Sequence, residues 1–439
     1  TGTLASGQTV ALKTDGTVTA ITGQVGTATT FAAGGNSEPR TGMCFDPDSN
    51  KVIIAYRDAA NSNHGYAIVG TVSGVSISFG TAVAFYSGSA INGSPAAAYD
   101  TTANKVVITY VYSNQLHAIV GTVSGTSISF GSTANISASP AYMDSVYDSS
   151  ANKTLVSYSN SLGSSYPTVV AISVSGTTPS FGSPVVVVSA GVQNTSLSYD
   201  TTASKSSLVI TNQSSSYLKA YAITISGTTP SAGSATDLGT FSNGADGLST
   251  AYDPDINRHI VVFRDRTSGA SQYFSNYIIF QISGTSIINN TAATAFTNFN
   301  GGNPRIDYDT GANKVVVIYN NVPAGYTLEA KVGAVTTSSI TFGDPLTIST
   351  DTIYTFGLLY DPTANKTVVA LGTNASQSND SQAVVLNATG IPNTSFLGIT
   401  DAAISNSASG SVTIKGGINK TVTGLTANQN YYVQNDGTL

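Results

Sequence analysis

Residues 99–110 read YDTTANKVVITY, and this stretch is one of seven copies of a motif that decides the fold. Each copy has an aromatic residue and Asp, three or four small residues, Asn-Lys or a variant of it, and then a β-branched run. Successive motif aspartates are 54, 48, 52, 53, 56 and 52 residues apart: Asp46, Asp100, Asp148, Asp200, Asp253, Asp309 and Asp361. A regular period of this length indicates a repeat architecture, with room for four strands in each unit.

The motif also predicts its own local structure. Asp can accept hydrogen bonds from backbone amides just ahead of it, and Asn tolerates the left-handed backbone that a tight hairpin needs. We therefore expect one strand to end at the aromatic-Asp pair and a second to follow, as in residues 105–110. A third strand, such as 117–123, leads through an Xaa-Gly turn (Ser124-Gly125) into a fourth. The units are predicted to be four-stranded antiparallel blades.

A blade exposes two faces that must be buried against neighbours, which a closed ring achieves without caps. The last unit has an ambiguous fourth strand, whereas residues 25–31 (VGTATTF) match the fourth strand of the first unit, 79–85 (FGTAVAF). We predict an all-β fold, a seven-bladed β-propeller over residues 21–395. In it, strand 25–31 completes the last blade.

Two further pieces lie outside this ring in the sequence. Residues 1–20 are expected to form a hairpin or linker around Asp15-Gly16, and residues 396–439 a β-rich C-terminal module with a Gly416-Gly417 turn. Both pieces contain Asp-Gly-Thr, so we expect them to pack together. The chain begins without an initiator Met or a leader and ends within an apparent strand, so we expect further protein on either side.

Composition excludes several classes of function. With 17 basic and 23 acidic residues and a net charge of −6, no nucleic-acid partner is expected. No apolar run approaches the ~20 residues that span a bilayer, so no membrane insertion is expected. A single cysteine, Cys44, excludes an internal disulfide framework. The scarcity of Lys and Glu, with abundant hydroxyl and amide side chains, is typical of many extracellular and virion proteins.

The acidic turns raise the alternative of a calcium site. Two copies of the motif, Asp46-Pro-Asp48-Ser-Asn50 and Asp253-Pro-Asp255-Ile-Asn257, resemble the start of a calcium loop, which offers oxygen ligands at alternate positions. No later bidentate Glu follows either copy. Turn formation is therefore the favoured interpretation, and no cofactor is expected.

The sequence also disfavours an enzyme. The chain has only two glutamates, Glu38 and Glu329, and neither lies in a recognisable catalytic motif. Other aspartates are scattered outside the turns, among them Asp58, Asp144, Asp246, Asp265, Asp307, Asp344 and Asp351. The three histidines, His64, His117 and His259, fall at unrelated places in their units. A propeller hydrolase would need two carboxylates roughly 5–10 Å apart in the axial funnel.

The loops of the repeats differ in a way that suggests a binding face. The turns after the first and third strands are short and uniform, whereas the loops after the second and fourth strands differ in every unit and share the opposite face of the disc. Tyr and Ser in such loops suit an adaptable recognition surface, although drift in unconstrained loops is an equal alternative. The chain has no Trp, but Tyr can replace it for sugar stacking. The candidate residues are Tyr112, Tyr166, Arg264, Tyr273, Phe274 and Tyr326.

These motifs resemble those of a known group of proteins. Blades such as residues 308–317 (YDTGANKVVV) are similar to the propellers of phage virion appendages, notably tail-fibre-like proteins of aquatic phages. The opening residues 5–10 and 15–18, and the closing residues 424–439, are similar to segments seen in the same proteins. The resemblance implies a virion surface protein for host attachment, repeated around a symmetric particle, and it transfers no catalytic residues.

Three functions remain as hypotheses at this point. The first is a non-enzymatic virion appendage of the tail-fibre or decoration type. Its loop face would bind a host-surface glycan or protein, and its C-terminal module would bind other virion proteins. The second is a secreted or cell-surface bacterial adhesin or lectin with the same fold. The third is a propeller hydrolase.

Overall fold

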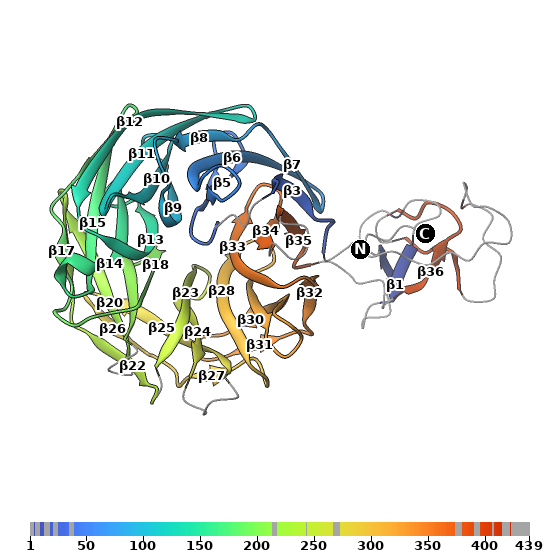
Figure 1. The fold of residues 1–439 in the computed structure, drawn as a ribbon. Coiled ribbons are helices and arrows are strands. Elements are labelled where there is room, and N and C mark those ends of the chain that lie inside the picture. Colours follow the sequence, from blue (N-terminus) through green and yellow to red (C-terminus); the bar gives the residue numbers. More distant parts are fainter. Residues whose placement is uncertain are drawn as a thin grey trace.

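The computed structural model is an all-β molecule in which seven antiparallel sheets surround a central axis (Figure 1). It describes residues 4, 9–12, 18–20, 25–34, 39–212, 217–242, 244–266, 273–373, 380–389, 396–405, 408–414 and 422. The predicted seven-bladed β-propeller is confirmed. Over these residues, no helix has the length and apolar character needed to cross a membrane.

The blades follow one another along the chain, and each begins next to the axis (Figure 1). The innermost strands all end at the motif aspartate: β4 (Met43–Asp46), β9 (Asn92–Asp100), β13 (Pro140–Asp148), β18 (Asn194–Asp200), β23 (Ala245–Asp253), β28 (Gly301–Asp309) and β33 (Ile353–Asp361). The second strands are β5 (Lys51–Asp58), β10 (Lys105–Tyr112), β14 (Lys153–Asn160), β19 (Lys205–Asn212), β24 (Arg258–Asp265), β29 (Lys314–Asn321) and β34 (Lys366–Thr373). The third strands are β6 (His64–Ser73), β11 (Gln115–Ser124), β15 (Tyr166–Ser175), β20 (Tyr217–Ser226), β25 (Ser275–Ser283), β30 (Thr327–Val335) and β35 (Ser381–Leu386).

In blade 2 the outer strand is continuous, as β12 (Ser127–Ser137). In blades 1, 3, 4, 5 and 6 it is split into two pieces, and both pieces pair with the third strand of the same blade. The pieces are β7 (Ser76–Phe79) with β8 (Val83–Tyr86), β16 (Thr178–Phe181) with β17 (Val185–Val186), β21 (Thr229–Ala232) with β22 (Thr236–Thr240), β26 (Ser286–Ile288) with β27 (Thr294–Ala295), and β31 (Ile340–Phe342) with β32 (Leu346–Ser349). One short 3₁₀ turn, η1 (Ser161–Gly163), follows β14.

The motif aspartate and asparagine act as the sequence predicted. Asp100 Oδ1, for example, accepts hydrogen bonds from the amides of Thr102 and Ala103 at 3.0 and 2.8 Å. The residue at the Asn position is left-handed in all seven turns, with φ between 51° and 54°, including the one copy where Ser204 replaces Asn. Local side-chain chemistry therefore fixes the hairpin that joins the two inner strands of every blade.

The aromatic residue of the motif ties each blade to its neighbour. Tyr99 Oη donates to Asp48 Oδ2 of the preceding blade at 2.9 Å, and Tyr308 Oη donates to Asp255 Oδ2 at 2.8 Å. Burial, reinforced by these carboxylates, raises the pKa of both phenols far above the ordinary value. Blade 1 has Phe45 at this position, and the junction between blades 7 and 1 instead uses a hydrogen bond from Thr363 Oγ1 to Asn50 Oδ1 of 2.7 Å.

The ring is closed by the start of the chain, as predicted. β3 (Thr29–Ala32) is the outer strand of blade 7 and pairs antiparallel with β35, while Val25 bridges Leu386 further along. Gly26 lies so close to the carbonyl oxygen of Val75 in blade 1 that a Cβ there would be only 1.8 Å from it. Gly80, its counterpart in blade 1, meets Thr126 of blade 2 in the same way. The closing strand thus reproduces the contacts of a covalently continuous one.

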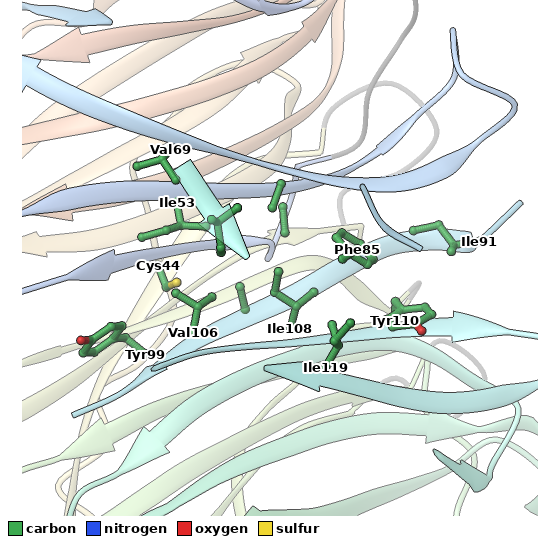
Figure 2. Close-up of a cluster of buried hydrophobic side chains, with 14 residues drawn as sticks. Cys44, Ile53, Val69, Phe85, Ile91, Tyr99, Val106, Ile108, Tyr110 and Ile119 are labelled. Atoms are coloured by element: carbon green, nitrogen blue, oxygen red, sulfur yellow. The ribbon is translucent and has the colours of Figure 1, made fainter. Parts of the chain in front are cut away.

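The hydrophobic core is divided among the junctions between blades. Figure 2 shows one such cluster, in which side chains of blade 1, such as Cys44, Ile53 and Phe85, pack against Val106 and Tyr110 of blade 2. The aromatic residues that end the second strands of five blades are at most 1% exposed, and all belong to these junctions: Tyr56, Tyr110, Tyr158, Phe263 and Tyr319. No blade could bury this surface alone, so the blades stabilise one another.

The two ends of the chain form a separate four-stranded sheet beside the ring (Figure 1). Its strands are β1 (Thr9–Leu12), β2 (Val18–Ala20), β36 (Phe396–Thr400) and β37 (Val412–Thr413), in the order β2-β1-β36-β37. The expected packing of the two ends is therefore observed. The predicted turns at Asp15-Gly16 and Gly416-Gly417, and the closing segment 424–439, lie outside the described residues.

We predict that Phe31→Ala lowers the free energy of unfolding by about 3–4 kcal/mol, the usual cost of removing a buried phenyl ring. Phe31 of the closing strand packs against Tyr56 and Phe79 of blade 1, with ring centroids 5.2 and 5.9 Å apart. Phe85 is the matched control, because it packs against Tyr110 and Phe130 of blade 2 in the same way. Chemical denaturation should give similar losses for Phe31→Ala and Phe85→Ala. No loss for Phe31→Ala would contradict this mode of closure.

We also predict that Tyr308→Phe lowers the free energy of unfolding by about 1 kcal/mol, since it removes one hydrogen bond to a partly solvated carboxylate. Tyr308 is buried, so the ring itself stays packed. Tyr354→Phe is the control, because the Tyr354 side chain is 43% exposed. Equal stability of the two variants in urea titrations would show that the phenol does not stabilise the junction.

Candidate functional site

The two faces of the disc are built differently. The turns after the first strands carry a left-handed Asn or Ser in every blade, and the turns after the third strands of blades 1 to 5 carry a left-handed Gly. The connections after the second and outer strands emerge on the opposite face and vary in length. We call this second surface the loop face.

A pocket of about 510 Å³ lies on the axis and is lined by all seven blades. Most of its lining comes from the first halves of the innermost strands, such as 92–97 of β9, 140–145 of β13 and 194–197 of β18. Those halves lie next to the connections from the preceding outer strands, so the pocket belongs to the loop-face end of the channel. Its volume is within the roughly 300–1,000 Å³ of small-molecule sites.

Two carboxylates of the pocket hold neighbouring strands together. Asp144 Oδ2 of blade 3 accepts from the amide of Leu197 in blade 4 at 2.8 Å, and from Ser196 Oγ at 3.0 Å. Asp307 Oδ2 of blade 6 accepts from the amide of Tyr360 in blade 7 at 2.7 Å. Burial raises the pKa of both carboxyls, and these hydrogen bonds lower it by less. For Asp307 the resulting pKa is about 6.

Two guanidinium groups in the same pocket are much less well paired. Arg305 Nη1 donates to the carbonyl of Leu248 at 2.7 Å, whereas its Nε is buried without a hydrogen-bond partner. Burial and the like charge of Arg40 lower the pKa of Arg305 to about 10, and Asp144 only partly offsets them. Arg40 is exposed and lines the pocket from blade 1.

An aromatic side chain at the pocket is held by a strained backbone. Tyr142 has φ of +52°, lies at a bulge between β13 and β14, and is 49% exposed. The corresponding left-handed positions of blades 5 and 6 are occupied by Gly247 and Asn303, which tolerate this conformation. A tyrosine here costs roughly 1–2 kcal/mol. Strain of this kind is common at sites of function, and Tyr142 is one of the residues that line the pocket.

Three of the sequence-predicted residues meet in one cluster on the loop face. Arg264 makes a two-pronged ion pair with Asp246, with both nitrogen–oxygen distances 2.6 Å. Burial would lower the pKa of Arg264, but the hydrogen bonds and charge of Asp246 outweigh it and raise the pKa, with Tyr273 and Tyr326 contributing. The guanidinium carbon lies 5.6 Å from the centre of the Tyr273 ring.

The cluster extends across blades 5, 6 and 7. Tyr326, itself left-handed at φ +65°, packs against Tyr354 of blade 7 with ring centroids 5.3 Å apart, and the two are 37% and 43% exposed. Asp246 lies two residues before the pocket residue Leu248 on β23. We call Asp246, Arg264, Tyr273, Tyr326 and Tyr354 the arginine–tyrosine cluster, and it borders the axial pocket.

The other predicted residues are not part of this arrangement. Tyr112 is half-buried and packs against Tyr86 at 4.8 Å and His117 at 5.9 Å, at the edge of the core between blades 1 and 2. Tyr166 is half-buried at the start of β15 in blade 3. Phe274 follows Tyr273, and its carbonyl accepts from the amide of Asp265. Tyr112 therefore packs against the core between blades 1 and 2 and lies outside the arginine–tyrosine cluster.

The two turns considered for calcium have their oxygens engaged within the protein. Asp46 Oδ1 accepts from the amides of Asp48 and Ser49, and Asp48 Oδ2 from Tyr99. In the other copy, Asp253 Oδ1, Asp255 Oδ2 and Asn257 Oδ1 accept from Asp255 N, Tyr308 Oη and Tyr252 Oη. Where the structure is described, no three or more His, Cys, Asp and Glu side chains form a group that could hold a metal ion.

The histidines lie in three different blades. His259 is fully buried in blade 5, where Nδ1 lies 2.8 Å from Ser198 Oγ and Nε2 lies 3.3 Å from Asp200 Oδ2, and burial lowers its pKa. His117 stacks on Tyr110 with ring centroids 5.1 Å apart. His64 begins β6. These positions fit ordinary strand residues.

Sequence reasoning missed Arg40, Tyr142 and Arg305 and treated Asp144 and Asp307 as scattered. A signal was available, because counting back from each motif aspartate places these residues, except Arg40, in the innermost strands. Arg305 is four residues before Asp309, and Asp144 is four residues before Asp148. The bulge that exposes Tyr142 recurs at Gly247 and Asn303, six residues before the motif aspartate, but the three residue types differ and share no sequence signal for a bulge.

Comparison with known proteins supports the propeller fold and indicates no function. No protein-family model and no curated protein matches the chain. A fungal alcohol oxidase with bound copper is 12% identical, with a TM-score of 0.51, over 84% of this chain and 77% of the oxidase. Saccharomyces cerevisiae Sqt1 is 9% identical, with a TM-score of 0.49, over 83% of this chain and 100% of Sqt1. A NanB sialidase variant from Streptococcus pneumoniae is 11% identical, with a TM-score of 0.45, over 83% and 70%. At these identities the likeness concerns the propeller fold alone.

We predict that Tyr142→Asn raises the free energy of unfolding by up to about 1 kcal/mol, because Asn adopts the left-handed conformation more readily than Tyr. Asn303 at the corresponding position of blade 6 shows that the bulge accepts this residue. Thermal and urea denaturation would measure the change. Tyr354→Asn is the control, since Tyr354 is similarly exposed and is not among the left-handed residues. A loss of stability in Tyr142→Asn would mean that packing of the ring outweighs the strain.

Proposed function

We propose that this chain is a non-enzymatic virion appendage of the tail-fibre or decoration type, whose loop face attaches to a host-surface glycan or protein. The resemblance of its repeats to phage appendage propellers supports the virion setting. The same resemblance leads us to propose that the protein acts in several symmetric copies and meets other virion proteins through its C-terminal module. The four-stranded sheet of β2, β1, β36 and β37 lies beside the ring, so contacts made there would leave the loop face free (Figure 1).

The observation that carries the binding proposal is the arginine–tyrosine cluster. Its guanidinium is fixed between a carboxylate and a ring, so it would lose little freedom on binding a ligand. Tyr326 and Tyr354 expose their aromatic surface beside it. A rigid polar group next to exposed aromatic surface is what recognition of a sugar or a polar protein patch needs.

A secreted or cell-surface adhesin or lectin would use the same surface. Negative-stain imaging of the native source separates the two settings, because only the appendage predicts particles that carry this protein at symmetric positions. The hydrolase alternative has one observation in its favour, namely that Asp144 and Asp307 line one pocket and have raised pKa values. Both carboxylates, however, accept hydrogen bonds from the backbone of the next blade, which gives them a structural role.

We predict that the purified protein binds a subset of glycans on an array or binds intact host cells, and that Tyr326→Ala combined with Tyr354→Ala weakens this binding at least about tenfold. Removal of an aromatic contact at the centre of an interface typically has such an effect. Leu162→Ala is the control, because Leu162 is 64% exposed on a loop of blade 3. Undiminished binding by the double variant would rule out this cluster, and no binding to any glycan or host cell would rule out the attachment function.

A further inference from the structure

We propose that the axial pocket is a subsite for an acidic saccharide, in which Arg40 and Arg305 bind the carboxylate of the sugar and the Tyr142 ring packs against its face. This inference rests on the proposed attachment function, and it assigns a ligand class to a site distinct from the arginine–tyrosine cluster. The inference follows from which polar groups of the pocket have hydrogen-bond partners within the protein and which have none.

The acceptors of the pocket are already used. Asp144 accepts three hydrogen bonds, from Leu197 N, Ser196 Oγ and Ser145 N, at 2.8, 3.0 and 2.9 Å. The two oxygens of Asp307 accept from Tyr308 N and Tyr360 N at 2.8 and 2.7 Å. These donors partly offset the two negative charges within the framework of the ring. The carboxylates therefore need no ligand.

The donors of the pocket are in surplus. Arg305 makes one hydrogen bond, to the carbonyl of Leu248, and its Nε is buried without a partner. Neither Arg40 nor Arg305 forms an ion pair among the described residues, although Arg40 is close enough to lower the pKa of Arg305. Two arginines that repel each other, one with an unsatisfied donor, favour a shared anionic acceptor. A carboxylate between them would supply it.

The shape of the pocket favours a sugar acid over a bare ion. A volume of about 510 Å³ exceeds what an inorganic anion needs and suits a small organic ligand. The lining also includes hydroxyl and amide side chains that match the polarity of a saccharide, such as Thr41, Asn92 and Ser249. The strained and exposed Tyr142 offers the aromatic surface on which a sugar ring can pack.

Glucuronate and glucose are the matched probes, because they differ only in the carboxylate. In isothermal titration calorimetry and saturation-transfer NMR, we expect glucuronate to bind at least about tenfold more tightly than glucose. Arg40→Gln should weaken glucuronate at least about tenfold and leave glucose unchanged, and Tyr142→Asn should weaken both sugars. Leu162→Ala is the control and should change neither. Arg305→Met should act like Arg40→Gln. If it fails to fold, Arg40→Gln still decides, because the Arg40 side chain is exposed.

The dependence on pH gives a second readout. The charged groups that line the pocket are Arg40, Asp144, Arg305 and Asp307, and Asp309 acts on Asp307 from the same strand. Arg305, with its pKa of about 10, and the sugar carboxylate stay charged between pH 7.5 and pH 5, whereas Asp307 with its pKa of about 6 becomes neutral. Loss of that negative charge should strengthen glucuronate binding several-fold at pH 5, while glucose binding stays constant.

The outcomes distinguish this inference from the attachment function. Equal affinity for glucuronate and glucose, or glucuronate binding that survives Arg40→Gln, would overturn the acidic subsite. Array binding confined to neutral glycans and lost with Tyr326→Ala and Tyr354→Ala would also overturn it, while the attachment function would stand. Sulfate that competes with glucuronate at equal concentration would reduce the pocket to a general anion site and overturn the sugar assignment. Binding of glucuronate by a protein that binds no host surface would keep the subsite and reject attachment.

Discussion

The structure depends on one constraint, which is that a four-stranded blade has two apolar faces and cannot bury either without a neighbour. Each hydrophobic cluster of the ring lies between two blades, as with Cys44 and Ile53 against Val106 in Figure 2. A row of such blades would leave its first and last faces in water, so the ring must close. The closing contact is made by β3, whose Phe31 reaches Tyr56 and Phe79 of blade 1 just as Phe85 reaches Tyr110 and Phe130 of blade 2.

Polar contacts between blades divide the molecule into a fixed face and a variable one. On the face opposite the loop face, the Tyr hydroxyl of one blade bonds to the Asp-Asn turn of its neighbour. The residues of that turn must therefore suit both their own hairpin and the next blade. Around the axial pocket, side chains such as Asp144 and Asp307 take over this role by accepting backbone amides of the next blade. The connections beyond them are joined from blade to blade by backbone hydrogen bonds, such as Ser139 N to Asn114 O and Ile353 N to Tyr326 O, which do not depend on side-chain identity. Their sequences are free to vary, which is the condition for a recognition surface.

The carboxylates and the arginines of the axial pocket also differ in how many hydrogen bonds they make within the protein. Its carboxylates accept two or three hydrogen bonds each from protein donors, whereas Arg305 makes one, to the carbonyl of Leu248, among the described residues. Arg264 at the rim shows the contrast, since Asp246 holds it by two short bonds and raises its pKa, while the pKa of Arg305 falls. Arg264 has two hydrogen-bond donors paired with Asp246, whereas the Nε of Arg305 has no partner. This difference, more than the number of arginines, is the basis for proposing a ligand with hydrogen-bond acceptors in the axial pocket.

The sequence by itself determined the blades, their number, the hairpins and the closure. Each of these rests on local chemistry or on a match between repeats, such as Asp100 bonding to the next amides or residues 25–31 matching residues 79–85. It also placed Arg264, Tyr273 and Tyr326 on one face, because the order of strands assigns each loop to a side. Only the tertiary structure decided that Arg40, Tyr142 and Arg305 share one pocket, while Tyr112 packs against the core between blades 1 and 2. The physical reason is that Arg40, Tyr142 and Arg305 are more than a hundred residues apart in the chain, so their meeting depends on the curvature of the closed ring. The bulge at Tyr142 recurs at Gly247 and Asn303 as backbone geometry, without a shared residue type.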